Sequence, residues 1–166
     1  GAIGPTGLRE KDINLAISKT LVGYLEEYGA KVQLTRSGDY YVSLAERVAL
    51  SHSLGAKIFI SIHCNSFGDS NKQGVETFYS AKGSDGKLLA QYVQNQLVSL
   101  RPSLDRGAKV GNLYVIRENL ATSVLTEVAF ISNPQEEALL ADPDYQQKVG
   151  RAIADGIEAF LEENQR

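Results

Sequence analysis

The sequence predicts a single α/β domain with a central twisted, mixed sheet that is flanked by helices on both faces. The length of 166 residues is enough for one hydrophobic core and hardly enough for two. Helical apolar periodicity alternates with short β-rich runs along most of the chain, which is typical of an α/β fold. Some β-rich runs follow one another without an intervening helix, and this favours a mixed sheet over a purely parallel one.

Two helices and two strands are expected in the first part of the chain. In order, these are a loop over 1–9, a helix over 11–28, a strand over 31–35, a helix over 43–55 and a strand over 58–64. Apolar residues spaced four apart predict the first helix, and Ser43 with Glu46 forms the capping box that begins the second. The run over 58–64 is too short for a buried helix, so we expect an interior strand.

The second part of the chain continues the same alternation. In order, we expect a strand over 75–79, a helix over 86–100, strands over 113–116 and 124–131, and a helical region from Pro134 to Phe160. Asn133 and Pro134 are typical first residues of a helix, and Asp142-Pro143 interrupts the helical region. Because no linker, repeat or low-complexity stretch divides these elements, we expect one domain over residues 1–166.

Composition excludes several classes of function. Seventeen Lys and Arg against twenty Asp and Glu give a net charge of −3, which argues against a protein that binds nucleic acid through a basic surface. Two histidines and one cysteine rule out the four-ligand Cys/His zinc frameworks. No apolar run approaches the roughly 18 residues of a membrane span. The chain begins on Gly1 and contains no methionine, so we expect a processed form or an excised piece with residues missing upstream.

Two candidate site residues interrupt apolar strands. His63 lies at the carboxyl end of its strand, where ligands bind in open α/β sheets, and strand alternation places it on one face with Ser61 and Asn65. A hydrogen-bonded structural histidine is the alternative. Glu127 lies within an otherwise uncharged strand, where a carboxylate is costly unless it is paired, protonated or bound to a metal. It is either a functional acid or base, or one half of an ion pair with a cation from a neighbouring helix.

Three further residues have simpler interpretations by position. Glu10 lies at the start of the first helix, where a carboxylate is favoured by the helix dipole. Glu76 alternates with its strand neighbours as an outward-facing, solvated residue would. His52 lies between two serines on a polar stretch of helix and is expected at the surface.

One histidine and two glutamates together suggest a metal-assisted hydrolase. Catalytic zinc sites commonly use three protein ligands and keep one position open for water, but a third ligand is not obvious in this chain. The adjacent pair His63 and Cys64 could instead indicate a thiol hydrolase. Neighbouring strand residues point to opposite faces and cannot form a nucleophile–base pair, so we discount this alternative.

Seven motifs in order resemble the zinc-dependent N-acetylmuramoyl-L-alanine amidases, which are bacterial cell-wall hydrolases. They are Gly1–Leu15, Leu34–Arg36, Ser43–Val48, Ser61–Asn65, Gly74–Tyr79, Asn112–Arg117 and Thr126–Asn133, and they cover essentially the whole chain. The resemblance implies a Zn²⁺ cofactor with His63 and Glu10 as ligands, which overturns the helix-dipole interpretation of Glu10. It also implies that Glu127 is the catalytic glutamate.

The resemblance further implies a substrate and a location. The substrate would be peptidoglycan, cut at the amide between N-acetylmuramic acid and L-alanine, in an extracytoplasmic compartment. The family's other ligand, a histidine in a Gly-His-Gly-Gly motif on a first strand, would precede Gly1, so residues 1–166 are expected to be an N-terminally incomplete catalytic domain. The alternatives are a non-catalytic peptidoglycan-binding relative, a form inactivated by loss of that segment, or a peptidase or deacetylase with a similar site. A cell-wall-binding or regulatory domain outside this chain is also an open expectation.

Overall fold

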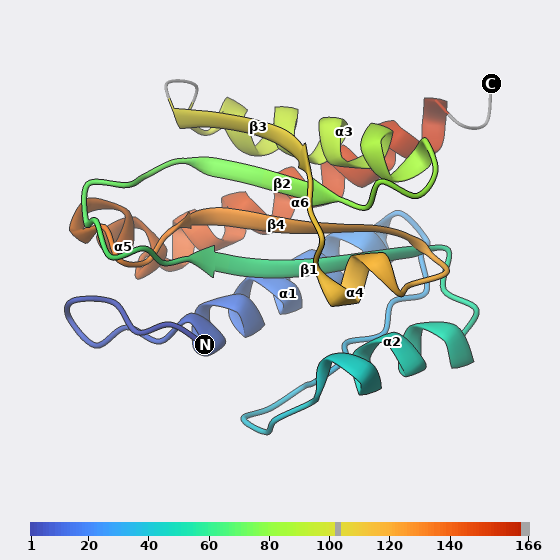
Figure 1. Cartoon of the computed structure of the whole chain (residues 1–166), viewed down its shortest axis with the longest axis horizontal. Coiled ribbons are helices and arrows are strands. Elements are labelled where there is room, and N and C mark those ends of the chain that lie inside the picture. The colour runs from blue at the N-terminus through green and yellow to red at the C-terminus, as the bar shows by residue number, and fades with distance from the viewer. Residues whose placement is uncertain (102–103, 164–166) are drawn as a thin grey trace.

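A four-stranded mixed sheet forms the centre of the computed structural model, which describes residues 1–101 and 104–163 (Figure 1). Its strands are β1 (Ile58–Asn65), β2 (Val75–Tyr79), β3 (Asp105–Val110) and β4 (Thr122–Phe130), in the spatial order β1-β4-β2-β3. β1 is parallel to β4 and β2 is parallel to β3, whereas β2 and β4 are antiparallel. The predicted α/β class and the mixed sheet are therefore confirmed.

Six helices accompany the four strands in the described residues. They are α1 (Glu10–Glu27), α2 (Leu44–Ser53), α3 (Asp85–Ser99), α4 (Tyr114–Arg117), α5 (Pro134–Leu140) and α6 (Pro143–Glu163). The Ser43 capping box begins α2 as predicted, and the Asn133 side chain accepts the first free N–H groups of α5.

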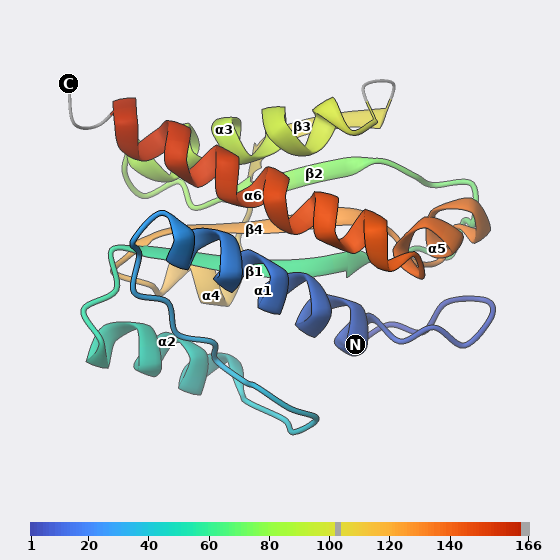
Figure 2. The same cartoon turned by 180° about the vertical axis from the view of Figure 1, so that it is seen from behind.

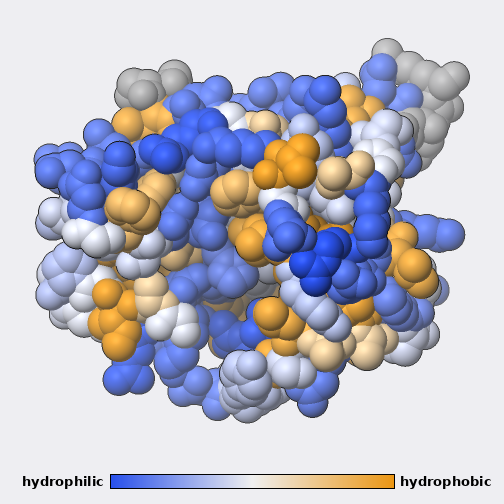
Figure 3. Space-filling view, in the orientation of Figure 1, coloured by the Kyte–Doolittle hydropathy of each residue, from blue (hydrophilic) through white to orange (hydrophobic). Residues whose placement is uncertain are grey.

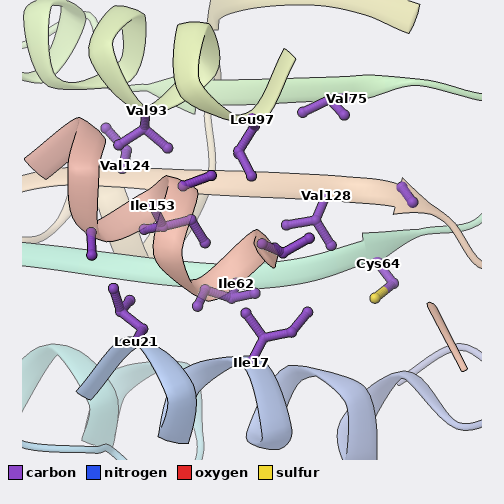
Figure 4. Packing of buried hydrophobic residues seen from close by; sticks show 14 of the residues in the cluster. Ile17, Leu21, Ile62, Cys64, Val75, Val93, Leu97, Val124, Val128 and Ile153 are labelled. Carbon is purple, nitrogen blue, oxygen red and sulfur yellow. The ribbon is translucent and has the colours of Figure 1, made fainter. Parts of the chain in front are cut away.

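The long helices α1, α3 and α6 all cover one face of the sheet (Figure 2). Their apolar stripes meet the strands in the main hydrophobic core, where Ile17 of α1, Val93 of α3 and Ile153 of α6 are fully buried (Figure 4). Ile62 and Cys64 of β1 point into this core, so the side chains between them in sequence must point to the other face.

The opposite face is covered only in part. A smaller core joins Val48 of α2 and Ile116 of α4 to Phe59 of β1 and Leu125 of β4. In the described residues no helix crosses this face at the carboxyl end of β1 (Figure 1). Helices thus flank both faces as predicted, and the lighter cover leaves room for a site beside His63.

Two predictions about the start of the sheet are wrong. Residues 31–35 form no strand, because no other described segment pairs with their backbone. The run over 58–64 is not an interior strand, since β1 pairs only with β4 within the described residues and so lies at the edge of the sheet. Apolar composition reports burial of the faces, and it does not report whether both edges of a strand are paired.

The region between α3 and β4 also differs from the prediction. Residues 113–116 were expected as a strand but contribute to the short helix α4, because a short apolar run fits either conformation. β3 was not expected, since Asp105–Val110 is polar and contains Gly107. Its pairing with β2 includes an irregularity, and Gly107 has a φ of 82°, which favours glycine.

Within the described residues, no helix is both long enough and apolar enough to cross a bilayer.

Candidate active site

The three proposed site residues come together from three different elements. Glu10 is the first residue of α1, His63 lies near the carboxyl end of β1, and Glu127 lies on β4 directly opposite His63 in the register. Residues opposite one another on paired strands share a face, so His63 and Glu127 point to the same side of the sheet. The fold therefore assembles one imidazole and two carboxylates from positions far apart in the sequence.

Glu10 and His63 form a pair in which Glu10 is buried and His63 is half-buried. His63 Nδ1 lies 2.9 Å from Glu10 Oε1, and the Glu10 side chain is 9% exposed. Glu10 also accepts hydrogen bonds from the backbone N–H groups of Ala2 (2.7 Å) and Cys64 (3.2 Å) and from the amide of Asn14 (3.1 Å). Burial raises the pKa of Glu10, but the hydrogen bonds and the His63 charge outweigh it and lower the pKa to about 2. The carboxylate is ionised and held in place.

The donor atoms of this pair suit a metal such as zinc. Two ligand atoms about 2.0–2.2 Å from a tetrahedral ion lie roughly 3.3–3.6 Å apart, so His63 Nδ1 and Glu10 Oε1, which are 2.9 Å apart, would have to separate slightly to bind one ion together. The other ring nitrogen, Nε2, lies 3.1 Å from the Ser61 hydroxyl, the kind of partner that fixes a ligating imidazole. In the described residues no group of three or more His, Cys, Asp or Glu side chains is placed to hold a metal ion.

Glu127 has a different environment. Its Oε2 atom is buried and has no hydrogen-bond partner in the described part of the chain. Burial raises the pKa of Glu127, and the Glu10 and Glu76 carboxylates raise it further against the opposing effect of His63, to about 7. A carboxyl that titrates near neutral pH can accept and return a proton.

The structure decides between several alternatives left open by the sequence. Glu10 is a buried partner of His63 rather than an exposed carboxylate at a helix end. Among the described residues Glu127 forms no ion pair with a cation. His52 is exposed as expected, and its Nε2 accepts the backbone N–H of Leu120. Burial, with the charges of nearby glutamates, raises the pKa of Cys64 well above its usual value, which disfavours a thiolate nucleophile.

The interpretation of Glu76 as a solvated residue is wrong. Glu76 is 6% exposed, because cations from the unpredicted strand β3 cover it. Its Oε2 lies 2.6 Å from Lys109 Nζ and 3.3 Å from Arg106 Nε, and its Oε1 accepts the side-chain amide of Asn65 at 2.7 Å. Glu76 stands opposite Glu127 in the antiparallel register, which puts it on the face of the sheet that carries the site.

Supporting residues give no comparable signal in the sequence. These supporting residues are Ser61, Asn14 and Glu137. Glu137 of α5 is 2% exposed and fixes the loop that precedes Glu10. Its carboxylate accepts the Thr6 backbone N–H and the Thr6 hydroxyl, each at 2.9 Å. An acidic residue inside a helix gives no sign in the sequence that it contacts a loop more than a hundred residues away.

A groove leads to the site along the free edge of β1. It has a volume of about 300 Å³ and is lined by Glu10 and Asn14 of α1, Ser61 and His63 of β1, and the segment 34–36. The His63 side chain is therefore accessible from solvent, whereas Glu10 borders the groove from a buried position.

Comparison with known proteins agrees with this arrangement. The sequence model of the family described as N-acetylmuramoyl-L-alanine amidase matches residues 1–159. The uncharacterized protein YqiI of Bacillus subtilis is 41% identical over 165 residues, which cover 98% of this chain and 79% of YqiI. The N-acetylmuramoyl-L-alanine amidase LytC of the same organism is 39% identical over 162 residues, and the match covers 96% of this chain and about a third (32%) of LytC.

A solved structure shows the same fold. The N-acetylmuramoyl-L-alanine amidase AmiC2 of Nostoc punctiforme superposes with a TM-score of 0.92 at 34% sequence identity, covering 98% of this chain and 89% of that one. The sequence match, the shared fold and the site geometry agree: the chain belongs to the N-acetylmuramoyl-L-alanine amidase family of bacterial cell-wall enzymes.

Proposed function

We propose that this chain is a zinc-dependent amidase that hydrolyses the bond between N-acetylmuramic acid and L-alanine in peptidoglycan. The observation that carries the proposal is the convergence of the three side chains: Glu10 contacts His63, and Glu127 lies opposite His63 on the neighbouring strand. Membership of the amidase family identifies the bond, and the residues supply the chemistry that this bond requires.

Glu10 and His63 are the residues that would hold the zinc ion. They provide a carboxylate oxygen and an imidazole nitrogen, two of the ligand types found in catalytic zinc sites. When bound, zinc lowers the pKa of water and polarises a carbonyl oxygen. Ser61 and the backbone N–H groups of Ala2 and Cys64 keep both ligand side chains oriented before any metal arrives.

Glu127 is proposed as the general base and acid. Its unsatisfied oxygen and its pKa of about 7 allow it to take a proton from the attacking water and to deliver it to the nitrogen of L-alanine as that amine leaves. Because peptidoglycan lies outside the cytoplasmic membrane, the proposal also implies an extracytoplasmic site of action.

The test is hydrolysis of purified peptidoglycan, followed by mass spectrometry of the released peptides. We expect stem peptides with a free L-alanine amine, loss of activity with a chelator, and recovery with Zn²⁺. Glu127→Gln should lower kcat by roughly 10²- to 10⁴-fold, because it removes the proton acceptor. Glu162→Gln changes the same functional groups at the exposed end of α6 and should leave kcat unchanged.

Release of peptides cut at any other bond would overturn the assignment of the substrate bond. Full activity of Glu127→Gln would overturn the role of Glu127, and full activity in the chelated protein would overturn zinc dependence.

A further inference from the structure

The site continues beyond His63 and Glu127 as a charged row across the sheet. His63 on β1 is opposite Glu127 on β4, and Glu127 is opposite Glu76 on β2. Arg106 and Lys109 of β3 extend the row from the far side of Glu76. Neighbouring strands are about 4.8 Å apart, so the row reaches roughly 10 Å from His63 to Glu76.

An irregularity in β3 brings the two cations to one carboxylate. Residues three apart on a regular strand point to opposite faces, as Arg106 and Lys109 would. The register between β2 and β3 shifts between Val75 and Thr77, and Gly107 has a φ of 82°. The alternation of side-chain direction along β3 is therefore interrupted between the two cations, and both can reach the same face. Bulges of this kind commonly redirect side chains next to functional sites.

Arg106 is held firmly in this position. Its guanidinium lies over the Phe130 ring at 5.1 Å, and Nη1 donates to the Gln73 carbonyl at 3.4 Å. The side chain also passes close to Gly74, where an added Cβ would lie 2.9 Å from the Arg106 Cγ. A long cationic side chain that is already ordered loses little conformational entropy when it binds a ligand.

The charges around Glu76 do not balance. Glu76 contributes one negative charge and the two cations contribute two positive charges, so these three side chains carry a net charge of +1, with the Glu127 carboxyl on the neighbouring strand not counted. The Arg106 and Lys109 side chains remain 36% and 40% exposed, whereas the Glu76 side chain is 7% exposed. Within the described residues, both cations keep N–H groups that no hydrogen bond uses. One of the two cations would be enough to neutralise the Glu76 carboxylate.

The surface above these residues is open to a ligand. In Figure 3 strongly hydrophilic atoms gather at the upper left of this face, over the first part of β3, and the surface is hollowed beside them over the middle of the sheet. A substrate group that extends from the His63 and Glu127 pair along the row would meet Arg106 and Lys109 next.

We infer that Arg106 and Lys109 form a subsite for a carboxylate of the stem peptide; this inference rests on the proposed amidase function. The glycan of peptidoglycan carries no ionised group once its lactyl carboxyl is in amide linkage, whereas the peptide carries carboxylates, so the cations belong to the peptide side of the cut bond. An extended peptide covers about 3.3–3.6 Å per residue, so the charged group lies two to three residues from the scissile amide. The free α-carboxylate of the D-glutamate that follows L-alanine fits this position.

The experiment compares two substrates that differ only at this carboxylate. N-acetylmuramoyl-L-alanyl-D-glutamate has the free acid, and N-acetylmuramoyl-L-alanyl-D-isoglutamine has the neutral amide. We expect the zinc-loaded protein to show a KM about ten-fold lower for the acid, as for one charge-assisted contact at a partly exposed site. Titration of the chelated protein, followed by NMR, should show the same preference in Kd.

Three variants identify the residue responsible. Lys109→Gln should remove most of the preference while Arg106 still neutralises Glu76, and Lys109→Arg should restore it. Lys87→Gln removes the same charge from an exposed position on α3 and should leave the preference at its original value. A circular dichroism spectrum of each variant shows that the fold is kept, and the rescue by arginine distinguishes lost charge from lost structure.

The outcomes separate this inference from the amidase proposal. Equal KM and Kd for the two compounds, or a preference that persists in Lys109→Gln, would overturn the carboxylate subsite even if both compounds are cleaved. If neither compound is cleaved but the acid still binds about ten-fold more tightly through Lys109, the carboxylate subsite is supported and the amidase proposal fails.

Discussion

Glu127 combines a buried position with an oxygen that has no hydrogen-bond partner in the described residues. Its pKa in the folded, metal-free protein is raised to about 7, chiefly by burial, from an ordinary value of 4.5. The folded state therefore holds this proton more tightly than the unfolded state does. The resulting stability is complete below about pH 4.5 and is lost as the pH rises towards 7.

Glu127→Gln should consequently stabilise the chelated protein at high pH. We expect the variant to exceed the wild type in free energy of unfolding by about 1–3 kcal/mol at pH 8 and by less than about 1 kcal/mol at pH 5. Urea denaturation of both proteins with EDTA present measures this difference. A gain of equal size at the two pH values would show that the carboxyl is not desolvated.

Ser61 tests the orientation of His63. Its hydroxyl lies 3.1 Å from His63 Nε2, and removal of such an outer partner typically weakens metal binding by 10- to 100-fold. Ser61→Ala should therefore raise the Kd for Zn²⁺ about ten-fold, measured by competition with a chromophoric chelator. Ser70→Ala, at an exposed loop position, is the matched control and should keep the original Kd. Equal affinities in the two variants would show that Ser61 does not orient the ligand.

The sequence indicated the candidate site residues but not the partners that support them. His63 and Glu127 could be found because each interrupts an apolar strand. Burying a polar group there costs free energy unless the group has a partner. The exposure of Glu76 was predicted wrongly, because the alternation of side chains shows which face of the strand a residue lies on but not what covers that face. The covering groups, Arg106 and Lys109, come from a strand whose composition does not predict it.

Among the elements, the loop over 1–9 depends on α5 for its position. Glu137 accepts both Thr6 donors, and a Cβ on Gly4 would lie 2.2 Å from its Oε1, so the loop backbone packs directly on this carboxylate. The loop in turn supplies the Ala2 N–H to Glu10. Glu137 is thus a positioning residue for the proposed zinc ligand.

Glu137→Gln should loosen this loop without unfolding the domain. We expect the Thr6 amide to exchange its hydrogen at least ten-fold faster, because a hydrogen bond to a charged acceptor is lost. The Kd for Zn²⁺ should also rise about ten-fold. Hydrogen exchange followed by NMR and metal titration measure the two effects, with Glu162→Gln as the control. Unchanged exchange at Thr6 would contradict the role of Glu137.

The packing of α3 against α6 requires glycine at position 156. A Cβ there would lie 2.7 Å from Val93 Cα and 3.0 Å from the Tyr92 carbonyl oxygen, and backbone atoms cannot move aside cheaply. Gly156→Ala should lower the free energy of unfolding by about 1–3 kcal/mol despite the better helix propensity of alanine.

Gly23 on α1 provides the matched comparison. Nothing lies within 4 Å of the place that a Cβ would take at this residue, so Gly23→Ala should raise the free energy of unfolding by up to about 1 kcal/mol. Urea denaturation of both variants measures the contrast. A gain in stability for Gly156→Ala would show that the two helices are not in close contact.

For the whole molecule, zinc should bind the folded state and stabilise it. Glu10 and His63 belong to α1 and β1, so a metal held by both would link two elements of the fold. With free Zn²⁺ at 100 times its Kd the gain is about 2.7 kcal/mol, equivalent to a rise in Tm of roughly 5–10 °C for a domain of this size.

The two histidines of the chain supply the test of this link. His63→Gln should abolish the zinc-dependent rise in Tm, whereas His52→Gln removes an exposed histidine on α2 and should retain it. Differential scanning calorimetry with Zn²⁺ and with EDTA makes the comparison. A rise in Tm that survives in His63→Gln would place the metal elsewhere.

The sequence by itself determined the α/β class, the capping of α2 and α5, and the candidates Glu10, His63 and Glu127. These follow from periodicity, from local backbone chemistry and from the motifs of the family. Only the tertiary structure decided that residues 31–35 lack a strand partner in the described part of the chain, that β1 is an edge strand there, and that Arg106 and Lys109 meet Glu76. Pairing and burial depend on which distant segments become neighbours, and a local sequence pattern does not determine this.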